Sequence, residues 1–235
     1  MRCAFLSDIH YKKGETTGEK LFLKFLYKKA HHFDRIYILG DLFEFYLGYP
    51  HFFYKEHRKV IGRLKLLSLW ETKIYMIEGN HEYGFTEAGK FLNMKVYRKN
   101  YIAHIDGRYV YLEHGDLINK KDLRHILCQY ILKSPAMLYV FKNIYPSVMM
   151  KLSHIAGNVS KNYLRAKNSA IEKMFVDYAL KIIEEKDMDV VILAHIHQPL
   201  YLKKGKKIYI NSGDFLEHCT FVVYENGNFY LDRMK

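Results

Sequence analysis

Short apolar runs recur along the chain, and most of them end at a cluster of polar residues. They comprise Cys3–Leu6, Ile36–Leu39, Ile74–Ile77, Tyr109–Leu112, Val190–Leu193, Lys207–Ile210, Thr220–Tyr224 and Phe229–Leu231. Short apolar runs bounded by turn residues are typical of strands buried in a sheet. Asn226-Gly227 separates the last two runs, and this dipeptide favours a tight hairpin turn, so we expect those strands to be neighbours.

Segments with helical periodicity lie between the strands. Apolar residues recur at helical spacing in Glu19–His32, around Lys55–Trp70 and in Ile171–Glu185. The first 115 residues therefore read as strands alternating with helices, with a short helix before the fourth strand, whereas the C-terminal part turns to strands. This order predicts the α/β class, with helices layered on a sheet.

Size and composition indicate one globular domain. The chain has 235 residues, of which 49% are hydrophobic and 26% charged, enough for a sizeable core. Cys3, Cys128 and Cys219 share no close spacing, which favours a reducing compartment. Because the first strand begins directly after Met1-Arg2 and no apolar stretch reaches about 18 residues, we expect a cytoplasmic protein without a spanning helix.

The formal net charge of +12 indicates an anionic partner. Nucleic acid, a phosphorylated metabolite and an anionic membrane surface are the three classes that this charge favours. Many lysines could equally coat solvated helix faces without contacting any partner.

Five polar clusters follow predicted strands. They are Asp8-Ile9-His10, Gly40-Asp41, Gly79-Asn80-His81, His114-Gly115-Asp116 and His195-Ile196-His197. The carboxyl ends of strands in α/β folds converge on one edge of the sheet, where ligands bind. We therefore expect these clusters to meet at one site.

The residue types in these clusters are those of a metal centre. The candidate ligands are Asp8, His10, Asp41, Asn80, His114, His195 and His197. Seven ligands exceed one tetrahedral site and suit two ions that share a bridging carboxylate. A set of Asp, Asn and His without thiolates favours Mn²⁺, with Fe²⁺ or Zn²⁺ as alternatives. Two such ions, about 3.5–4 Å apart, would activate a hydroxide and neutralise a phosphoryl group.

The region from Ile118 to Ser169 differs from the rest of the chain. It is rich in apolar residues, including Met137–Phe141, is broken by Pro135 and Pro146, and has lysines and arginines throughout. One interpretation is a helical hairpin that packs on the core. The other is a helical cap over the active edge, with an apolar, Met-rich face for an acyl chain.

The clusters together resemble the signatures of the calcineurin-like metallophosphoesterases. The matching motifs read S-D-I-H, G-D-L-F-E, G-N-H-E, H-G-D and A-H-I-H. The resemblance implies an α/β/β/α sandwich of two facing sheets with helices outside. By this resemblance, one metal is held by Asp8, His10, Asp41 and His197, and the other by Asn80, His114 and His195, with Asp41 as the bridge.

The resemblance also implies catalytic roles. His81 stands where the family places a histidine that contacts the phosphate and assists the leaving group. Glu82 stands where the family commonly has Asp, the partner that orients this histidine. Asp116 is a candidate hydrogen-bond partner of a metal-bound histidine, or alternatively a turn residue.

Three longer segments resemble a branch of the family that hydrolyses UDP-2,3-diacylglucosamine in lipid A synthesis. They are Tyr37–Gly48, Tyr111–Asp116 and Asn211–Phe215. In that branch the insertion at residues 118–169 caps the site, which makes Asn162, Arg165, Lys167 and Asn168 candidate contacts to the diphosphate and sugar. His81 departs from the best-known members, which have Arg at this position.

Two other functions remain open at this point. One is a soluble phosphoesterase acting on nucleotides or other phosphodiesters, with the insertion serving as core or dimer contact. The other is a nucleic-acid phosphodiesterase that exploits the basic charge. No recognisable DNA-reading motif occurs in the insertion, so we do not expect nucleic acid as the partner.

Overall fold

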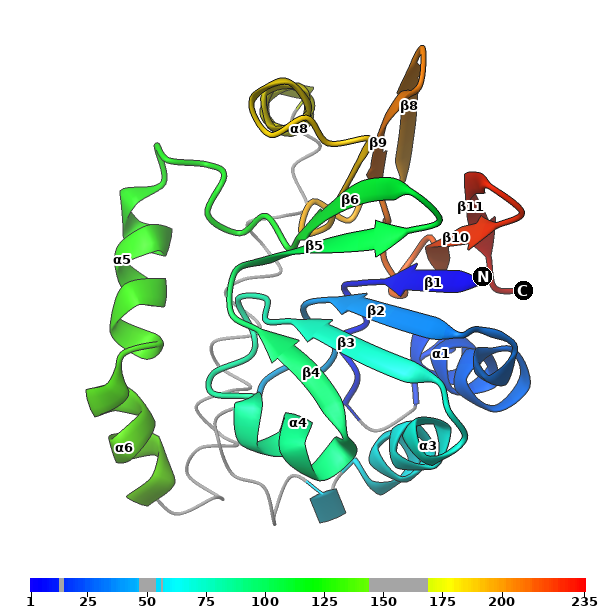
Figure 1. Cartoon of the computed structure of the whole chain (residues 1–235). Coiled ribbons are helices and arrows are strands. Elements are labelled where there is room, and N and C mark those ends of the chain that lie inside the picture. The colour runs from blue at the N-terminus through cyan, green and yellow to red at the C-terminus, as the bar shows by residue number, and fades with distance from the viewer. Residues whose placement is uncertain (13–14, 47–53, 56, 144–168) are drawn as a thin grey trace.

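Two β-sheets lie face to face in the computed structural model, which describes residues 1–12, 15–46, 54–55, 57–143 and 169–235 (Figure 1). The first sheet has the order β11-β10-β1-β2-β3-β4. Its strands are β1 (Cys3–Leu6), β2 (Arg35–Leu39), β3 (Lys73–Ile77), β4 (Met94–Tyr97), β10 (Thr220–Glu225) and β11 (Asn228–Arg233). Strands β1 to β4 run parallel, and β10 and β11 form an antiparallel hairpin as predicted.

The second sheet has the order β5-β6-β7-β9-β8. Its strands are β5 (Asn100–Ile105), β6 (Arg108–Glu113), β7 (Val190–Leu193), β8 (Leu200–Lys204) and β9 (Lys207–Asn211). The central strands β6, β7 and β9 are parallel, and β5 and β8 pair antiparallel at the two edges.

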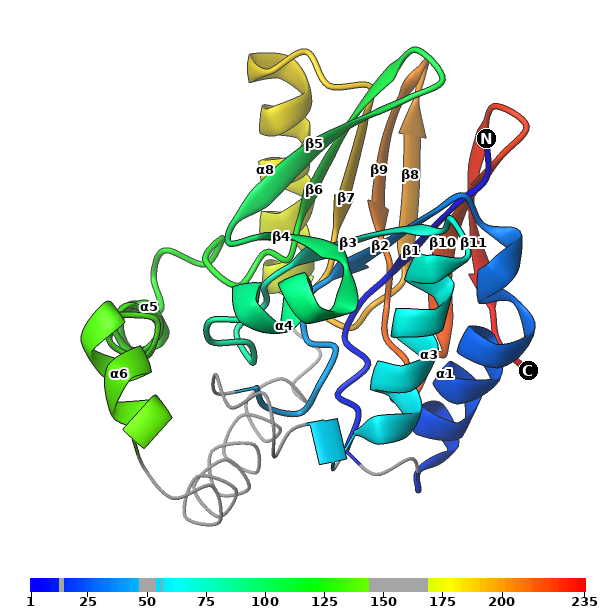
Figure 2. The same ribbon diagram turned by 60° about the horizontal axis from the view of Figure 1, so that its bottom comes forward.

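Helices cover the outer face of each sheet (Figure 2). The first sheet carries α1 (Thr17–Lys28), α3 (Arg58–Leu69) and α4 (Thr86–Leu92), and the second carries α8 (Ser169–Glu185). Alternation along β1 illustrates the layering, because Cys3 and Phe5 face the second sheet while Ala4 and Leu6 face the helices. The predicted α/β/β/α sandwich is confirmed.

The first helix begins earlier than its apolar spacing predicts. Thr16 accepts a hydrogen bond from the Glu19 backbone N–H at 3.2 Å, and Glu19 accepts one from the Thr16 N–H at 2.9 Å. This capping box satisfies N–H groups that have no partner within the helix, so α1 begins at Thr17 rather than Glu19. The helix ends at Lys28, and Ala30–His32 form a separate 3₁₀ turn, η1.

Three strands, β4, β5 and β8, were not predicted from the sequence. They lie at sheet edges, where solvent-exposed side chains interrupt the apolar pattern. β8, for example, ends in Lys203-Lys204. Edge strands give a weaker signal than central ones because only part of their surface is buried.

The region predicted as an insertion contains α5 (Leu123–Leu132) and α6 (Pro135–Asn143). Both helices lie to one side of the sandwich (Figure 2). The predicted substrate contacts Asn162, Arg165, Lys167 and Asn168 lie outside the described residues. Among the helices that the structure describes, none has the length and apolar character needed to cross a bilayer.

Candidate metal centre

The five polar clusters meet at one edge of the sandwich, beyond the carboxyl ends of strands from both sheets. Asp8 and His10 follow β1, Asp41 follows β2, Asn80 follows β3, His114 follows β6, and His195 and His197 follow β7. Most of the seven side chains are buried, with Asp8 fully inaccessible to solvent. Convergence of parallel strand ends therefore brings together residues that are far apart in sequence.

Five of these residues have left-handed backbone conformations. Their φ angles are +49° for Asp8, +48° for His10, +53° for Asp41, +72° for His195 and +58° for His197. Residues other than glycine rarely adopt positive φ, and such conformations concentrate at functional sites, where the surrounding structure holds them in place. The backbone here turns sharply after each strand and directs the side chains inward.

Asp41 occupies the middle of the centre. Its Oδ2 atom lies 3.6 Å from His10 Nε2, 3.5 Å from His114 Nε2 and 3.9 Å from His81 Nε2. Its Oδ1 atom accepts a hydrogen bond from the His81 backbone N–H at 3.0 Å. One carboxylate thus faces imidazoles from both sides, which is the position that a bridging ligand requires.

One set of candidate ligands surrounds Asp8. Its Oδ1 atom lies 3.3 Å from His197 Nε2, and its Oδ2 atom accepts a hydrogen bond from the His195 backbone N–H at 3.1 Å. Ligand atoms of Asp8, His10 and His197 all lie within 4.8 Å of one another, and so do those of Asp8, Asp41 and His114.

The other set surrounds His114. Its Nδ1 donates a hydrogen bond to the Leu39 carbonyl at 2.8 Å, which directs Nε2 into the centre. That Nε2 lies 3.1 Å from Asn80 Oδ1 and 3.2 Å from His195 Nδ1. The structure therefore brings Asn80, His114 and His195 close to one another, and their division into two ligand sets stays a prediction.

Several atoms of the candidate ligands are buried without a hydrogen-bond partner among the described residues. They are Asp8 Oδ1, both ring nitrogens of His10, and His197 Nε2. A buried polar atom without a partner is costly unless an ion or water satisfies it. Carboxylate oxygens and imidazole nitrogens that converge in this way fit divalent cations.

Burial and neighbouring charges set the protonation of the centre. Although burial opposes its charged form, the adjacent His197 holds the pKa of Asp8 far below its usual range. Burial, reinforced by His114, lowers the pKa of His195 to about 3, which keeps a neutral imidazole available as a ligand. For His114, burial is outweighed by the carboxylates of Asp41 and Asp8, which raise its pKa to about 9.

The His81 ring is oriented by a backbone carbonyl. Its Nδ1 donates to the carbonyl oxygen of Glu44, so Nε2 points toward Asp41. We predicted this orienting role for Glu82, but the Glu82 carboxylate instead accepts four backbone N–H groups. Its donors are Asp41 at 2.9 Å, Leu42 at 2.8 Å, Phe43 at 3.4 Å and Gly79 at 3.0 Å. Glu82 therefore joins the two loops that carry the candidate ligands Asp41 and Asn80.

The sequence motifs contained two further residues to which we had assigned no role. Glu44, in G-D-L-F-E, supplies the carbonyl that orients His81, and its carboxylate lies 3.7 Å from His10 Nδ1. Asp214, in N-S-G-D-F, lies 3.7 Å from His197 Nδ1. Carboxylates beside metal-binding histidines fix the orientation of the ring. Both carboxylates stand within motifs that the sequence analysis singled out, and that position was the signal from which their roles could have been inferred.

Asp116 lies beside the centre but makes a different contact from the one predicted. Its Oδ2 atom has no hydrogen-bond partner among the described residues and lies 3.9 Å from the ammonium of Lys133 on α5. Burial alone would raise the pKa of this carboxyl, but nearby positive charge lowers it below its ordinary value, and Lys133 contributes most to that lowering. Among the described residues, Asp116 thus pairs with a lysine from the predicted insertion, and it lies in a turn, as the alternative prediction had it.

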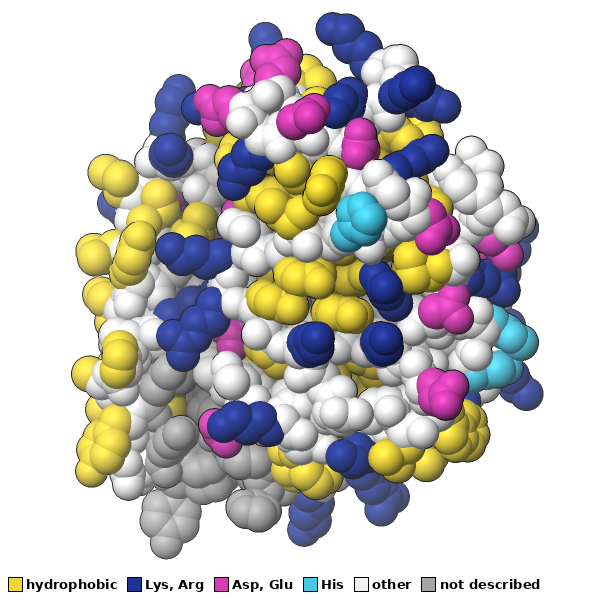
Figure 3. Space-filling model, viewed as in Figure 1, with side chains coloured by type: hydrophobic (Ala, Val, Ile, Leu, Met, Phe, Trp, Pro, Cys, Tyr) yellow, Lys and Arg dark blue, Asp and Glu magenta, His cyan; other side chains and the backbone are white. Residues whose placement is uncertain are grey.

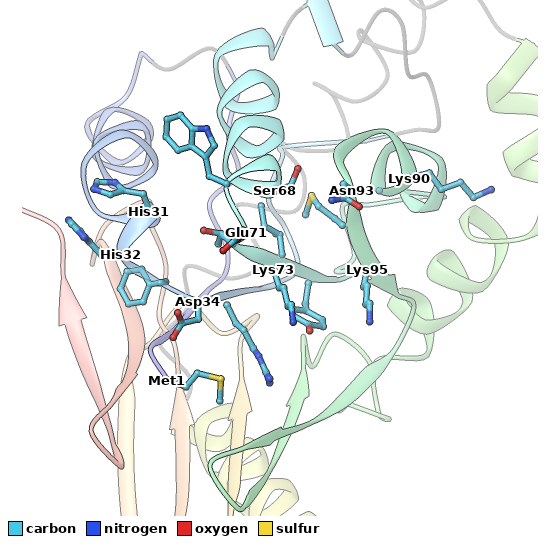
Figure 4. Close-up of a pocket in the computed structure, with 18 residues that line it drawn as sticks. Met1, His31, His32, Asp34, Ser68, Glu71, Lys73, Lys90, Asn93 and Lys95 are labelled. Atoms are coloured by element: carbon cyan, nitrogen blue, oxygen red, sulfur yellow. The ribbon is translucent and has the colours of Figure 1, made fainter.

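A separate open pocket of about 1070 Å³ lies at the opposite ends of the strands (Figure 4). Its lining includes Arg35, Lys73 and Met94, the first residues of β2, β3 and β4. None of the seven candidate ligands lines it. The convergence of ionisable groups, and not this pocket, identifies the candidate functional site.

A family model described as calcineurin-like phosphoesterase matches residues 1–199. The chain belongs to the calcineurin-like phosphoesterase family. This phosphoesterase is therefore a metal-dependent hydrolase, and the buried carboxylates and imidazoles described above are its candidate ligands.

Two relatives show similarity to this phosphoesterase over most of its length. A UDP-2,3-diacylglucosamine hydrolase from Ectopseudomonas mendocina (strain ymp) is 28% identical, with 83% of this chain and 80% of the relative covered. A protein of the same name from Stutzerimonas stutzeri (strain A1501) is 26% identical, with 83% and 81% covered. Among solved structures, an archaeal phosphodiesterase is similar in fold, with a TM-score of 0.52 and 14% sequence identity. The superposition covers 99% of this chain and 99% of that one.

Proposed function

We propose that this phosphoesterase hydrolyses UDP-2,3-diacylglucosamine to UMP and 2,3-diacylglucosamine 1-phosphate. The observation that carries the proposal is the similarity to hydrolases of that name over 83% of this chain. Water would add to the phosphorus nearest the uridine, and the bond from that phosphorus to the oxygen shared with the second phosphate would break.

The metal centre would use the seven predicted ligands. Asp8, His10, Asp41 and His197 would hold one divalent ion, and Asn80, His114 and His195 the other, with Asp41 bridging. Mn²⁺ is our first choice, because oxygen and imidazole ligands without thiolates suit it. When bound, two such ions supply a nucleophile at neutral pH and neutralise phosphoryl charge.

His81 would act on the substrate itself. Hydrogen bonding of Nδ1 to the Glu44 carbonyl fixes the tautomer and leaves Nε2 facing the centre beside Asp41. From there the imidazolium form of the ring would donate a hydrogen bond from Nε2–H to a phosphoryl oxygen and stabilise the charge that develops there, assisting departure of the sugar phosphate.

The pair of helices α5 and α6 adjoins this site and supports an acylated substrate. Phe141 of α6 is buried, with its ring centroid 6.3 Å from that of Tyr83, two residues after His81. Met137, one turn earlier on α6, is only half-buried. We propose that α5 and α6 form part of a helical cap, residues 118–169 of a single domain of residues 1–235, and that its apolar side chains contact the acyl chains.

The outer surface of α5 and α6 supports a peripheral membrane location. Large apolar side chains are exposed there (Figure 3, left edge), namely Leu123, Leu127, Tyr130, Ile131, Tyr139 and Val140. Exposed basic residues lie nearby, with Lys120 and Lys121 just before α5 and Arg124 in its first turn. Apolar and cationic groups together favour an anionic bilayer surface, which we propose is the cytoplasmic face of the membrane.

Release of UMP tests the proposal. With Mn²⁺ present, UDP-2,3-diacylglucosamine is compared with UDP-glucosamine lacking acyl chains. We expect kcat/KM to be at least about 100-fold higher for the acylated compound, since burying even a few CH₂ groups contributes about 0.8 kcal/mol each. Equal turnover of both, or turnover only of simple phosphodiesters, would leave a phosphoesterase but reject this substrate.

A further inference from the structure

Helix α5 directly contacts the backbone of the loop after β3, which carries Gly79 and the candidate ligand Asn80. Lys133, at the C-terminal end of α5, donates a hydrogen bond from Nζ to the Gly79 carbonyl at 2.7 Å. One turn earlier, Gln129 Nε2 lies 3.4 Å from the Asn80 carbonyl oxygen, and Gln129 is only 6% exposed. Both side chains project from the same face of the helix, because residues four positions apart lie one above the other.

Lys133 also approaches the loop after β6, which carries the candidate ligand His114. Its ammonium lies 3.9 Å from Asp116 Oδ2, two residues after His114. A single cation from α5 therefore lies between the loop that carries Asn80 and the loop that carries His114. Both of these residues belong to the same proposed metal site.

The Gly79 loop has little freedom to move without disturbing the centre. A Cβ atom added at Gly79 would lie 2.2 Å from Asp41 Oδ1, so the loop packs tightly against the bridging carboxylate. The Gly79 N–H is bound by Glu82, and the Gly79 carbonyl is bound by Lys133. The glycine is thus fixed from both sides of its backbone.

We propose that Lys133 is a positioning residue that joins the α5 helix to the metal centre and fixes the Gly79–Asn80 loop for metal binding. This inference rests on the proposed role of Asn80 and His114 as ligands. Because the same contacts serve the helix and the loop, ordering of the loop by metal also orders α5. Coupling of this kind is reciprocal, so loosening α5 weakens metal binding.

Calorimetric titration of the metal-free protein with Mn²⁺ tests the positioning role. Lys133→Met removes the ammonium and keeps the aliphatic chain, and we expect metal affinity to fall about tenfold, the lower range for residues that support ligands. Lys133→Arg retains a cationic donor and should restore affinity to within about threefold. Lys206→Met is the matched control, since Lys206 is exposed in the turn between β8 and β9 and should leave affinity unchanged.

Hydrogen exchange in the wild-type protein tests the coupling without any substitution. We expect Mn²⁺ to slow exchange of the backbone amides of Leu123–Leu132, and Lys133→Met to abolish that effect while the melting temperature stays within a few degrees. Unchanged metal affinity in Lys133→Met, or α5 exchange insensitive to Mn²⁺, would overturn the inference. Neither readout depends on the lipid substrate, so failure of UMP release would reject the proposed substrate alone.

Discussion

The Glu82 carboxylate accepts a hydrogen bond from the backbone N–H of Asp41 at 2.9 Å. The same carboxylate accepts the N–H of Gly79 at 3.0 Å, so one buried side chain holds the loops after β2 and β3 together. Burial raises the pKa of Glu82, yet both of its oxygens face N–H donors, and the ionised form is therefore the one that these contacts stabilise.

Glu82→Gln should destabilise the loops rather than alter proton transfer. The amide NH₂ would face backbone N–H donors in place of one oxygen, leaving buried donors unpaired. We expect a loss of about 1–3 kcal/mol in the free energy of unfolding, measured in urea, together with weaker Mn²⁺ binding. Wild-type stability and metal affinity combined with a selective loss of kcat would restore the role of orienting His81.

His81→Gln should separate catalysis from metal binding. His81 contacts Asp41 through its backbone N–H, which the substitution retains, whereas the imidazole that faces the centre is lost. We expect kcat to fall by about 10²–10⁴, the usual contribution of a positioned acid or base, with Mn²⁺ stoichiometry unchanged. Loss of bound metal in this variant would instead make His81 a ligand.

Stability of the metal-free protein should depend on pH through His57. Burial lowers the pKa of His57 to about 4, below its ordinary value of 6.5, so the unfolded chain binds an extra proton between these values. Stability should therefore be intact above pH 6.5 and fall as the pH drops toward 4. Between pH 6.5 and 4, the free energy of unfolding of the wild type should fall by about 1.4 kcal/mol more per pH unit than that of His57→Gln. Parallel pH profiles would contradict this assignment.

The α5 and α6 surface should support membrane binding. Leu127 and Tyr130 are 61% and 69% exposed, so replacing both with Ser should leave the fold intact. We expect at least about a tenfold loss of binding to phosphatidylglycerol vesicles, because each side chain contributes about 1.5–3 kcal/mol when buried. Hydrolysis of bis-p-nitrophenyl phosphate is the control and should not change. Unaltered vesicle binding would place the membrane contact elsewhere.

The central strands and long helices could be predicted because their physical signal is local. Strands such as Val190–Leu193 are buried on both faces and read as continuous apolar runs. Edge strands such as β8 carry exposed lysines and lose that signal. The start of α1 was missed because apolar spacing does not reveal a cap, although Thr16 and Glu19 have the spacing of a capping box.

The sequence was enough to predict which types of residue form the candidate site and that they meet beyond the strand ends. Strand-end placement brought Asp8, His10 and His197 together, and the buried atoms without partners among the described residues are of types that divalent cations bind. Which group orients the His81 ring could not be read from the sequence. It depends on the directions in which the Glu82 carboxylate and the Glu44 carbonyl point in the folded structure. Lys133 gave no signal at all, since its contact with Gly79 depends on how α5 packs on a distant loop.

The central claim is a two-metal centre bridged by Asp41, and metal counting tests it most directly. Mass spectrometric measurement after loading with Mn²⁺ and desalting should give two ions per wild-type chain. Asp41→Ala should retain neither ion and lose activity together with them, because one carboxylate serves both sites. Two retained ions in Asp41→Ala, or a single ion in the wild type, would contradict the bridged centre.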